Sequence, residues 1–284
     1  MDFKHIAVIG IGLIGSSLAL SLKKAGFSGK ISGIGRRQEN LARARELGII
    51  DSFTTSHAEG VKNADLIVLA SSVQHFKQIV TDIKDELKQG AIVTDVGSVK
   101  AEIVNQLEPL MPDGVSFVAG HPIAGKECSG INAASPDLFR NAKCIITPSA
   151  NTDKTALKKI RDFWEFIGTG TIVMSPEEHD SVFAAVSHLP HIAAYALINA
   201  INDVNEDMLQ LSGKGLKDMT RIALSPPSLW RDICSHNRKD IILSLKSFSS
   251  VISRIMQLIE ESDWDGLEKE FKRASEARQL IESD

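Results

Sequence analysis

One short segment near the start of the chain constrains its fold more than any other. An apolar run, residues 5–9, leads directly into the pattern Gly-x-Gly-x-x-Gly, and a helical pattern follows through residue 24. In such a turn the first glycine permits the bend, the second lets a pyrophosphate approach the backbone, and the third packs helix on strand. The amino end of the helix attracts phosphate. A tight turn without a ligand is the alternative. The residues expected to bind a dinucleotide here are Gly10, Gly12, Leu13, Ile14 and Gly15.

Apolar runs alternate with helical patterns as far as residue 174. The runs at 65–70 and 91–94 are typical of strands in a parallel sheet that is covered on both faces. After them, Ser175-Pro176-Glu177-Glu178 has the serine cap, proline and glutamate of a helix start, and no strand pattern follows. The sequence therefore predicts an α/β fold: a Rossmann-like, doubly wound nucleotide-binding domain over residues 1–174 and an all-helical domain over residues 175–284.

Length, charge and cysteine usage narrow the class of protein. A chain of 284 residues is longer than one hydrophobic core usually supports, so two domains are expected. A net charge of -4 gives no basic face for binding nucleic acid. No run of about 18 apolar residues suggests a membrane span. Cys128, Cys144 and Cys234 are widely spaced, which suits a reducing compartment and offers no zinc site. With no signal segment before the first strand, the protein is expected in the cytoplasm.

The end of the second predicted strand bears on which cofactor is bound. About twenty residues after the glycine turn, an acid usually binds the adenine ribose, but residues 30–34 run into Gly35-Arg36-Arg37. The planar guanidinium group of arginine can donate two hydrogen bonds to the oxygens of a 2′-phosphate. NAD or NADP is therefore expected, with a slight preference for NADP. The alternative is that both arginines form the solvated first turn of the helix at 38–47.

A histidine among glycines is the strongest candidate for chemistry. The segment from Val118 to Lys126 places His121 beside Pro122 and three glycines, directly after a predicted strand at 115–118. Proline favours an extended conformation for the preceding residue, so the direction in which the His121 ring points is restricted. Ser98 follows the strand at 91–94, and strand ends of this kind meet where ligands lie. The alternatives are a histidine that bonds backbone and a serine that caps its helix.

The helical half supplies further polar candidates. His188 and His191 lie three residues apart on an apolar helix that Pro190 should kink. Each is either a core histidine whose hydrogen bonds are satisfied within the protein or a contact to the substrate. A metal site is not expected, because the sequence offers no third ligand. Arg221 should pair with a carboxylate, of the substrate or of Asp218. Apolar positions over 241–259 form a helical seam that is either core or a dimer interface.

With these residues laid out, the chain resembles the prephenate dehydrogenase family of tyrosine biosynthesis, whose relatives include arogenate dehydrogenases. The motifs that carry the resemblance are Gly10 to Gly15, Thr94 to Lys100, Gly120 to Gly125, His179-Asp180 with Ser187 to His191, and Lys217 to Arg221 with Trp230. The resemblance implies oxidative decarboxylation of prephenate, with hydride transfer to NAD(P). It also implies a homodimer formed through the C-terminal helices, in a short form without a mutase or regulatory domain.

The resemblance implies roles for individual residues. His121 would accept the hydrogen of the substrate hydroxyl and Ser98 would hold the reacting groups in register. Arg221 would bind the ring carboxylate. The pyruvyl side chain and pocket wall would involve Ser187, His188, His191 and Trp230, and further cofactor contacts would come from Arg36, Arg37, Ser71, Ser72 and Val73. Two positions depart from many relatives: Gly35, where an acid is common, and Ser72, where proline is common.

Three other functions are compatible with part of this pattern. Arogenate could replace prephenate as the substrate. A β-hydroxyacid dehydrogenase would need a lysine on the long helix at 177–202, which has none. A non-catalytic redox sensor would bind the dinucleotide but would not need the histidine, serine and arginine candidates.

Overall fold

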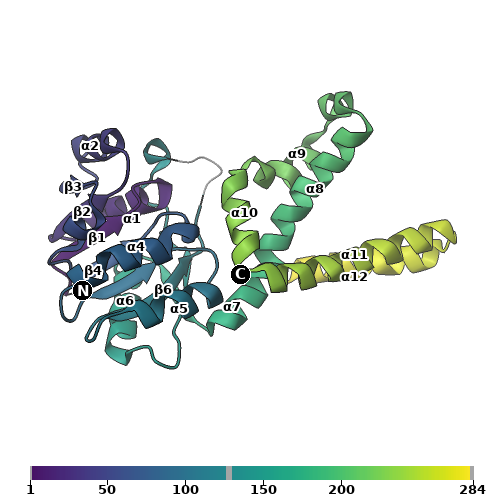
Figure 1. Ribbon diagram of the computed structural model, residues 1–284. Coiled ribbons are helices and arrows are strands. Elements are labelled where there is room, and N and C mark those ends of the chain that lie inside the picture. The colour runs from purple at the N-terminus through teal and green to yellow at the C-terminus, as the bar shows by residue number, and fades with distance from the viewer. Residues whose placement is uncertain (1, 126–129, 282–284) are drawn as a thin grey trace. The chain divides into compact units, whose positions relative to one another are not determined.

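The computed structural model describes residues 2–125 and 130–281, so Lys126 and Cys128 lie outside the described residues. An eight-stranded sheet forms its centre, in the order β3-β2-β1-β4-β5-β6-β7-β8 (Figure 1). Neighbours from β3 to β6 are parallel, β7 is antiparallel to β6, and β8 is parallel to β7. The strands are β1 (His5–Ile9), β2 (Lys30–Ile34), β3 (Ser52–Thr54), β4 (Leu66–Leu69), β5 (Ile92–Asp95), β6 (Ser116–Pro122), β7 (Lys143–Thr147) and β8 (Gly170–Val173).

Helices connect the strands and cover the sheet. Apolar side chains of α1, α2 and α6 share one buried cluster with the central strands, while α3, α4, α5 and α7 contact one another in series. The helices are α1 (Leu13–Lys24), α2 (Gln38–Glu46), α3 (His57–Val61), α4 (Phe76–Ile83), α5 (Ala101–Leu107), α6 (Lys154–Phe166) and α7 (Pro176–Phe183). Single 3-10 turns are η1 (Val73–His75), η2 (Lys84–Glu86), η3 (Glu108–Leu110) and η4 (Ile131–Ala133). The expected doubly wound α/β fold is confirmed.

The glycine turn has the geometry that the sequence predicts. Gly10 has a φ of 107°, and a Cβ atom there would lie 2.5 Å from the carbonyl oxygen of Ala70. A Cβ atom on Gly15 would lie 2.1 Å from the carbonyl oxygen of Gly10. Glycine is therefore required at both positions, because a side chain would push β1, α1 and the end of β4 apart.

The prediction that the strand ends at residue 118, before His121, was wrong. Strand β6 continues past Val118, where its pairing with β5 ends, and Ala119 to Pro122 pair with the antiparallel strand β7. His121 lies opposite Ile145 in this ladder. Because β7 lies more than twenty residues later in the chain, local sequence gave no sign of this pairing. The backbone of His121 is held by a sheet, which fixes the ring more firmly than a loop would.

A single turn of π-helix interrupts the first long helix of the second half. Helix α7 ends at Phe183, the π-helical turn η5 covers Ala184–His188, and α8 (Leu189–Val204) begins with Pro190 in its first turn. The break falls where the proline was expected to kink the helix, since proline leaves a carbonyl one turn back without its usual donor. After it come η6 (Glu206–Leu211), α9 (Lys214–Thr220), η7 (Arg221–Leu224) and α10 (Pro227–His236).

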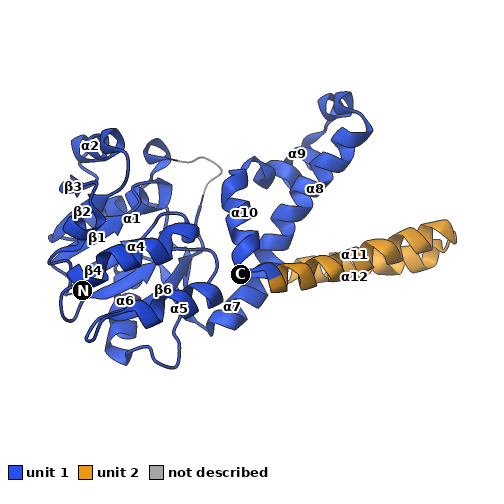
Figure 2. Cartoon of the chain, in the orientation of Figure 1, with its two compact units in different colours: residues 1–238 blue, residues 239–284 orange. Residues whose placement is uncertain are grey.

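The chain divides into two compact units, residues 1–238 and 239–284 (Figure 2). The second unit contains most of α11 (Arg238–Glu260) and all of α12 (Trp264–Gln279), and an ion pair of 2.7 Å joins Arg254 to Glu270. Along the seam in α11, Phe248, Ile252 and Ile259 are 41%, 42% and 48% exposed. These positions are therefore not core within the described chain, whereas Ile241 at the start of the seam is buried. The proposed domain boundary at residue 174 stays a prediction.

Two helical stretches meet the length and hydropathy expected of a membrane span, Pro176–Val204 and Arg238–Glu260. Neither stretch is an uninterrupted apolar run, since both contain polar and charged residues. Core helices of water-soluble proteins and helices with apolar partner-binding faces also meet this criterion of length and hydropathy, so the finding is weak evidence for a membrane.

Candidate active site

A cavity of about 550 Å³ opens at the carboxyl ends of β1, β2 and β4. Its floor is the glycine turn, and α1 has Gly12 as its N-cap with no acidic side chain in its first turn. A helix end of this kind accepts an anion through free backbone N–H groups and the helix dipole. Ser71 lines the cavity, and among the described residues its buried Oγ has no hydrogen-bond partner. This cavity therefore fits the pyrophosphate of a dinucleotide.

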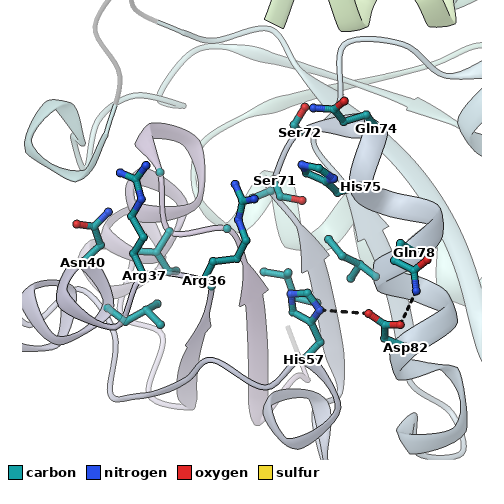
Figure 3. Close-up of a pocket in the computed structure, with 18 of the residues that line it drawn as sticks. Arg36, Arg37, Asn40, His57, Ser71, Ser72, Gln74, His75, Gln78 and Asp82 are labelled. Carbon is teal, nitrogen blue, oxygen red and sulfur yellow. Dashed lines mark hydrogen bonds and ion pairs between the residues drawn. The ribbon is translucent and has the colours of Figure 1, made fainter. Parts of the chain in front are cut away.

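The far end of this cavity has basic and polar walls (Figure 3). Arg36 and Arg37 lie between β2 and α2, and both side chains line the cavity beside Asn40. Because α2 begins at Gln38 with Arg37 as its N-cap, neither arginine is in the first helical turn. His57 lies opposite, 3.7 Å from Asp82. The cavity could hold a nucleotide ribose here, with or without a 2′-phosphate.

A second cavity of about 680 Å³ shares a wall with the first. The segment after β4 separates them, since Ala70, Ser71, Ser72 and Ser228 line both. Ser72 Oγ donates to Asp232 of α10 at 2.7 Å, which ties this wall to the helix that carries Trp230. Of the expected site residues, the second cavity is lined by Leu13, Ile14, Ser71, Ser72, Val73, Ser98, His121, Ser187, His188, His191 and Trp230.

His121 lies in the wall of the second cavity and is almost fully buried. Its Nδ1 lies 2.8 Å from Nε2 of His179, so the nitrogen that remains for a ligand is Nε2. Burial lowers the pKa of His121 well below its usual value, and the neighbouring His179, Lys100 and His188 lower it further. The ring is therefore neutral at physiological pH and can accept a proton.

A buried ion pair between Lys100 and Asp95 lies next to the strand that carries His121. Lys100 Nζ contacts the carboxylate of Asp95 and donates to the carbonyl of Gly120 at 2.9 Å, and both charged side chains are fully buried. The backbone N–H groups of Gly97 and Gly120 donate to the same carboxylate at 2.8 and 3.2 Å. This network joins the end of β5 to β6 one residue before His121.

Ser98 lines the second cavity and does not cap the following helix. Helix α5 has Lys100 as its N-cap, and its first free N–H groups, from Lys100 and Ala101, donate to Asp180 of α7 at 2.8 and 2.9 Å. The capping explanation for Ser98 is therefore not needed. Its role toward a ligand stays a prediction.

His188, the last residue of the π-helical turn, and His191, in the first turn of α8, differ in their surroundings. His188 is fully buried, Asn237 Nδ2 lies 3.2 Å from its Nδ1, and burial lowers its pKa to about 4. His191 is more accessible: its Nδ1 donates to the carbonyl of Ser187 at 2.9 Å, and its ring stacks on Trp230 at 3.8 Å. Trp230 Nε1 is buried and has no partner among the described residues, so it is a donor available to a ligand.

Arg221 is the first residue of η7 and is exposed, next to Ile222, which lines the second cavity. Arg221 is thus not among the residues that line the cavity, although its neighbour in the sequence is.

Several residues that shape the site were not predicted. His179 and Asp180 were noticed only as part of a motif, and their buried hydrogen bonds depend on α7 packing against α5. Asn40, His57 and Asp232 line the cofactor cavity from separate elements. Only Asn40 had a local signal, because it lies one helical turn after the arginine pair. The others come together through tertiary contacts that residue spacing does not reveal.

A doubly wound sheet with a glycine turn under one cavity, and histidines around the next, is the architecture of a dinucleotide-dependent dehydrogenase. The family model of the prephenate dehydrogenase nucleotide-binding domain matches residues 18–173, and that of the prephenate dehydrogenase dimerization domain matches residues 175–273. The chain belongs to the prephenate dehydrogenase family.

Individual relatives are similar over nearly the whole chain. Prephenate dehydrogenase of Bacillus subtilis is 35% identical over 96% of this chain and 75% of its own length. The crystal structure of the Aquifex aeolicus enzyme with hydroxyphenyl propionate and NAD+ has a TM-score of 0.94 at 37% identity, covering 99% of both chains. Arogenate dehydrogenase of Synechocystis has a TM-score of 0.83 at 29% identity, covering 98% of this chain and 99% of that one.

Proposed function

We propose that this chain catalyses the oxidative decarboxylation of prephenate to 4-hydroxyphenylpyruvate. The observation that carries the proposal is the wall that the two cavities share at Ser71 and Ser72, because a dinucleotide bound on the glycine turn would present its nicotinamide there to a substrate beside His121. When bound, the nicotinamide accepts hydride from C4 of the substrate. His121 accepts the proton of the 4-hydroxyl through Nε2, and the ring carboxylate leaves as carbon dioxide as the ring becomes aromatic.

The remaining side chains are assigned by their positions around the second cavity. Ser98 lies on the strand-end segment next to β6 and would keep hydroxyl and imidazole in register. Arg221, next in the sequence to the lining residue Ile222, would bind the ring carboxylate through its fixed positive charge. Ser187, His188, His191 and Trp230 would enclose the side chain of the substrate, with Trp230 Nε1 as a donor.

The hydrogen bonding of His191 bears on the choice between prephenate and arogenate. Because Nδ1–H is donated to Ser187, a neutral ring offers only a lone pair at Nε2. A lone pair suits the ammonium group of arogenate, whereas the keto acid of prephenate requires the protonated ring. Burial lowers the pKa of His191, so the neutral form predominates at physiological pH. The histidine alone therefore does not favour prephenate, and arogenate remains the alternative substrate.

The substrate preference can be measured directly. We expect turnover of prephenate, and the ratio of kcat/KM for prephenate to that for arogenate should rise only as pH falls below about 6.5, the usual imidazole pKa, because burial lowers the pKa of His191 and delays its protonation. In His191→Gln, whose amide offers a donor and an acceptor at every pH, the ratio should vary less. A parent ratio that does not change with pH, or changes equally in His191→Gln, would remove His191 from substrate selection.

We propose that NADP is accepted with little discrimination and a slight preference over NAD. No carboxylate stands at position 35 to repel a 2′-phosphate, and Arg36 and Arg37 line the cavity where that group would lie. A guanidinium that reaches the phosphate forms a charge-assisted pair, which is stronger than a neutral hydrogen bond.

Gly35→Asp should shift the ratio of kcat/KM values toward NAD by about 10- to 100-fold, through repulsion of the 2′-phosphate. The substitution has room, since the nearest atom to an added Cβ is a Leu41 methyl at 3.6 Å. Gly35→Asn has the same shape without the charge and should shift the ratio much less. If both variants keep the parent ratio, the nucleotide ribose does not lie beside residue 35.

We further propose that the protein is a cytoplasmic homodimer assembled through its C-terminal helices. The match to a dimerization domain supports a dimer. The exposed apolar side chains along α11, including Phe248 and Ile252, provide a surface for it, since contiguous apolar patches of this kind usually mark an interface. Burial of these faces in a dimer would also account for the hydropathy of α8 and α11.

A further inference from the structure

We propose that His179 and Asp180 are positioning residues that hold His121 in the one neutral tautomer able to accept the proton of the substrate. This inference rests on the proposed role of His121 as the proton acceptor. It concerns three side chains joined in series by hydrogen bonds, from Asp180 through His179 to His121. The direction of each hydrogen bond follows from the groups at the Asp180 end.

Asp180 fixes the first donor. Its two carboxylate oxygens accept from the backbone N–H groups of Lys100 and Ala101 at 2.8 and 2.9 Å. Burial raises the pKa of Asp180, whereas the two backbone N–H groups and the charge of Lys100 act to lower it. Because backbone N–H groups can only donate and both oxygens accept from one, we assign the carboxylate as ionised, and an ionised carboxylate can only accept. His179 Nδ1 lies 2.8 Å from Oδ1 of the same carboxylate. His179 Nδ1 must therefore carry a hydrogen and donate it to Asp180.

The second step follows from the neutrality of His179. Burial lowers the pKa of His179 to about 2, and the positive charge of Lys100 contributes. A neutral imidazole that carries hydrogen on Nδ1 has a lone pair on Nε2. That lone pair lies 2.8 Å from Nδ1 of His121, so His121 must donate through Nδ1. A neutral His121 then has its own lone pair on Nε2, the nitrogen required to take up the hydroxyl proton.

Packing keeps the three groups in place. The ring of Phe183 stacks on that of His179, with 4.4 Å between ring centroids, and lies edge-on to that of His121, with 5.0 Å between centroids. Lys100 holds both ends of the series, because its backbone N–H donates to Asp180 and its Nζ donates to the carbonyl of Gly120. The ring of His121 is thus fixed by β6 on one side and by α7 on the other.

The other ionisable groups around His121 do not provide this control. Lys100 is a donor that is engaged with Asp95 and Gly120. His188 has its Nδ1 beside Asn237. Burial raises the pKa of the Cys144 thiol, on the neighbouring strand β7, so it stays protonated. Among the described residues, the acceptor that the structure gives to Nδ1 of His121 is His179.

Two substitutions at position 179 separate positioning from packing. His179→Phe keeps an aromatic ring against Phe183 but removes the acceptor, whereas His179→Gln places an amide oxygen near the position of Nε2. We expect kcat with prephenate to fall by about 10- to 1000-fold in His179→Phe, in the direction seen when the aspartate of a catalytic triad is replaced. The kcat of His179→Gln should be at least tenfold higher than that of His179→Phe. KM and the dissociation constant of the cofactor should change little in both.

The tautomer of His121 can be observed without turnover. Nitrogen NMR of histidine-labelled protein, with the His121 signals identified by their absence in His121→Asn, should show hydrogen on Nδ1 in the parent and on Nε2 in a fraction of His179→Phe. Asp180→Asn should perturb the same signals. A parent with hydrogen on Nε2, or a His179→Phe variant with unchanged tautomer and turnover, would refute the proposal. If His121→Asn itself retained full activity, the proposed function of His121 would fail, while the observed tautomer would still stand.

Discussion

Replacing His121 with asparagine should lower kcat with prephenate by about two to four orders of magnitude, with cofactor binding close to that of the parent. An amide has no lone pair basic enough to take the hydroxyl proton, although it can still bond to His179. The side chain lines the second cavity and not the first, so the dinucleotide keeps its contacts. The effect should appear in kcat far more than in KM.

Steady-state kinetics and cofactor titration of the same preparations provide the measurement. His236→Asn is a matched control, because His236 ends α10 and lines neither cavity. Turnover of His121→Asn within a few fold of the parent would show that another group accepts the proton.

The pH profile of the parent gives an independent check of this role. From an ordinary imidazole, activity would be expected to fall near pH 6 to 7. Burial and the neighbouring His179, Lys100 and His188 lower the pKa of His121 well below that range. The acid limb of kcat/KM should therefore begin at clearly lower pH, since the ring stays neutral and able to accept as the solution is acidified.

The second large effect concerns stability. Lys100→Met should reduce the free energy of unfolding by about 3–5 kcal/mol, because it leaves the carboxylate of Asp95 buried without its partner. Burial already raises the pKa of Asp95, and the loss of Lys100 would raise it further. The variant would also lose the hydrogen bond to the carbonyl of Gly120, next to His121.

Urea denaturation at neutral pH measures this loss. Lys158→Met is the control: Lys158 pairs with Asp162 on α6, its side chain is 75% exposed, and its removal should leave stability nearly unchanged. Equal midpoints for Lys100→Met and the parent would show that Asp95 is tolerated without its partner and that the buried pair does not stabilise the fold.

The parts of the fold that could be predicted are those governed by local periodicity and by glycine. The turn at Gly10 to Gly15 requires glycine for steric reasons that are visible in the sequence, and the apolar strand runs matched the sheet. The break at Pro190 was similarly local, because proline disturbs the helix turn that precedes it.

What could not be predicted depends on contacts between distant segments. The extension of β6 through His121 follows from pairing with β7, and the series from Asp180 to His121 requires α7 to pack beside α5. His188 and His191 looked alike in the sequence, yet one is sealed beside Asn237 and the other stacks on Trp230. Burial, which decides the protonation of all these groups, is a property of the folded chain.

In the proposed reaction, the site couples oxidation of the substrate to loss of its ring carboxylate. The most direct test is a single-turnover experiment with prephenate and NADP or NAD that follows reduced cofactor, carbon dioxide and 4-hydroxyphenylpyruvate together. Under the proposed function, all three should form in equal amounts and at the same rate. Carbon dioxide released without cofactor reduction, or no reduction with either cofactor when prephenate is present, would contradict it.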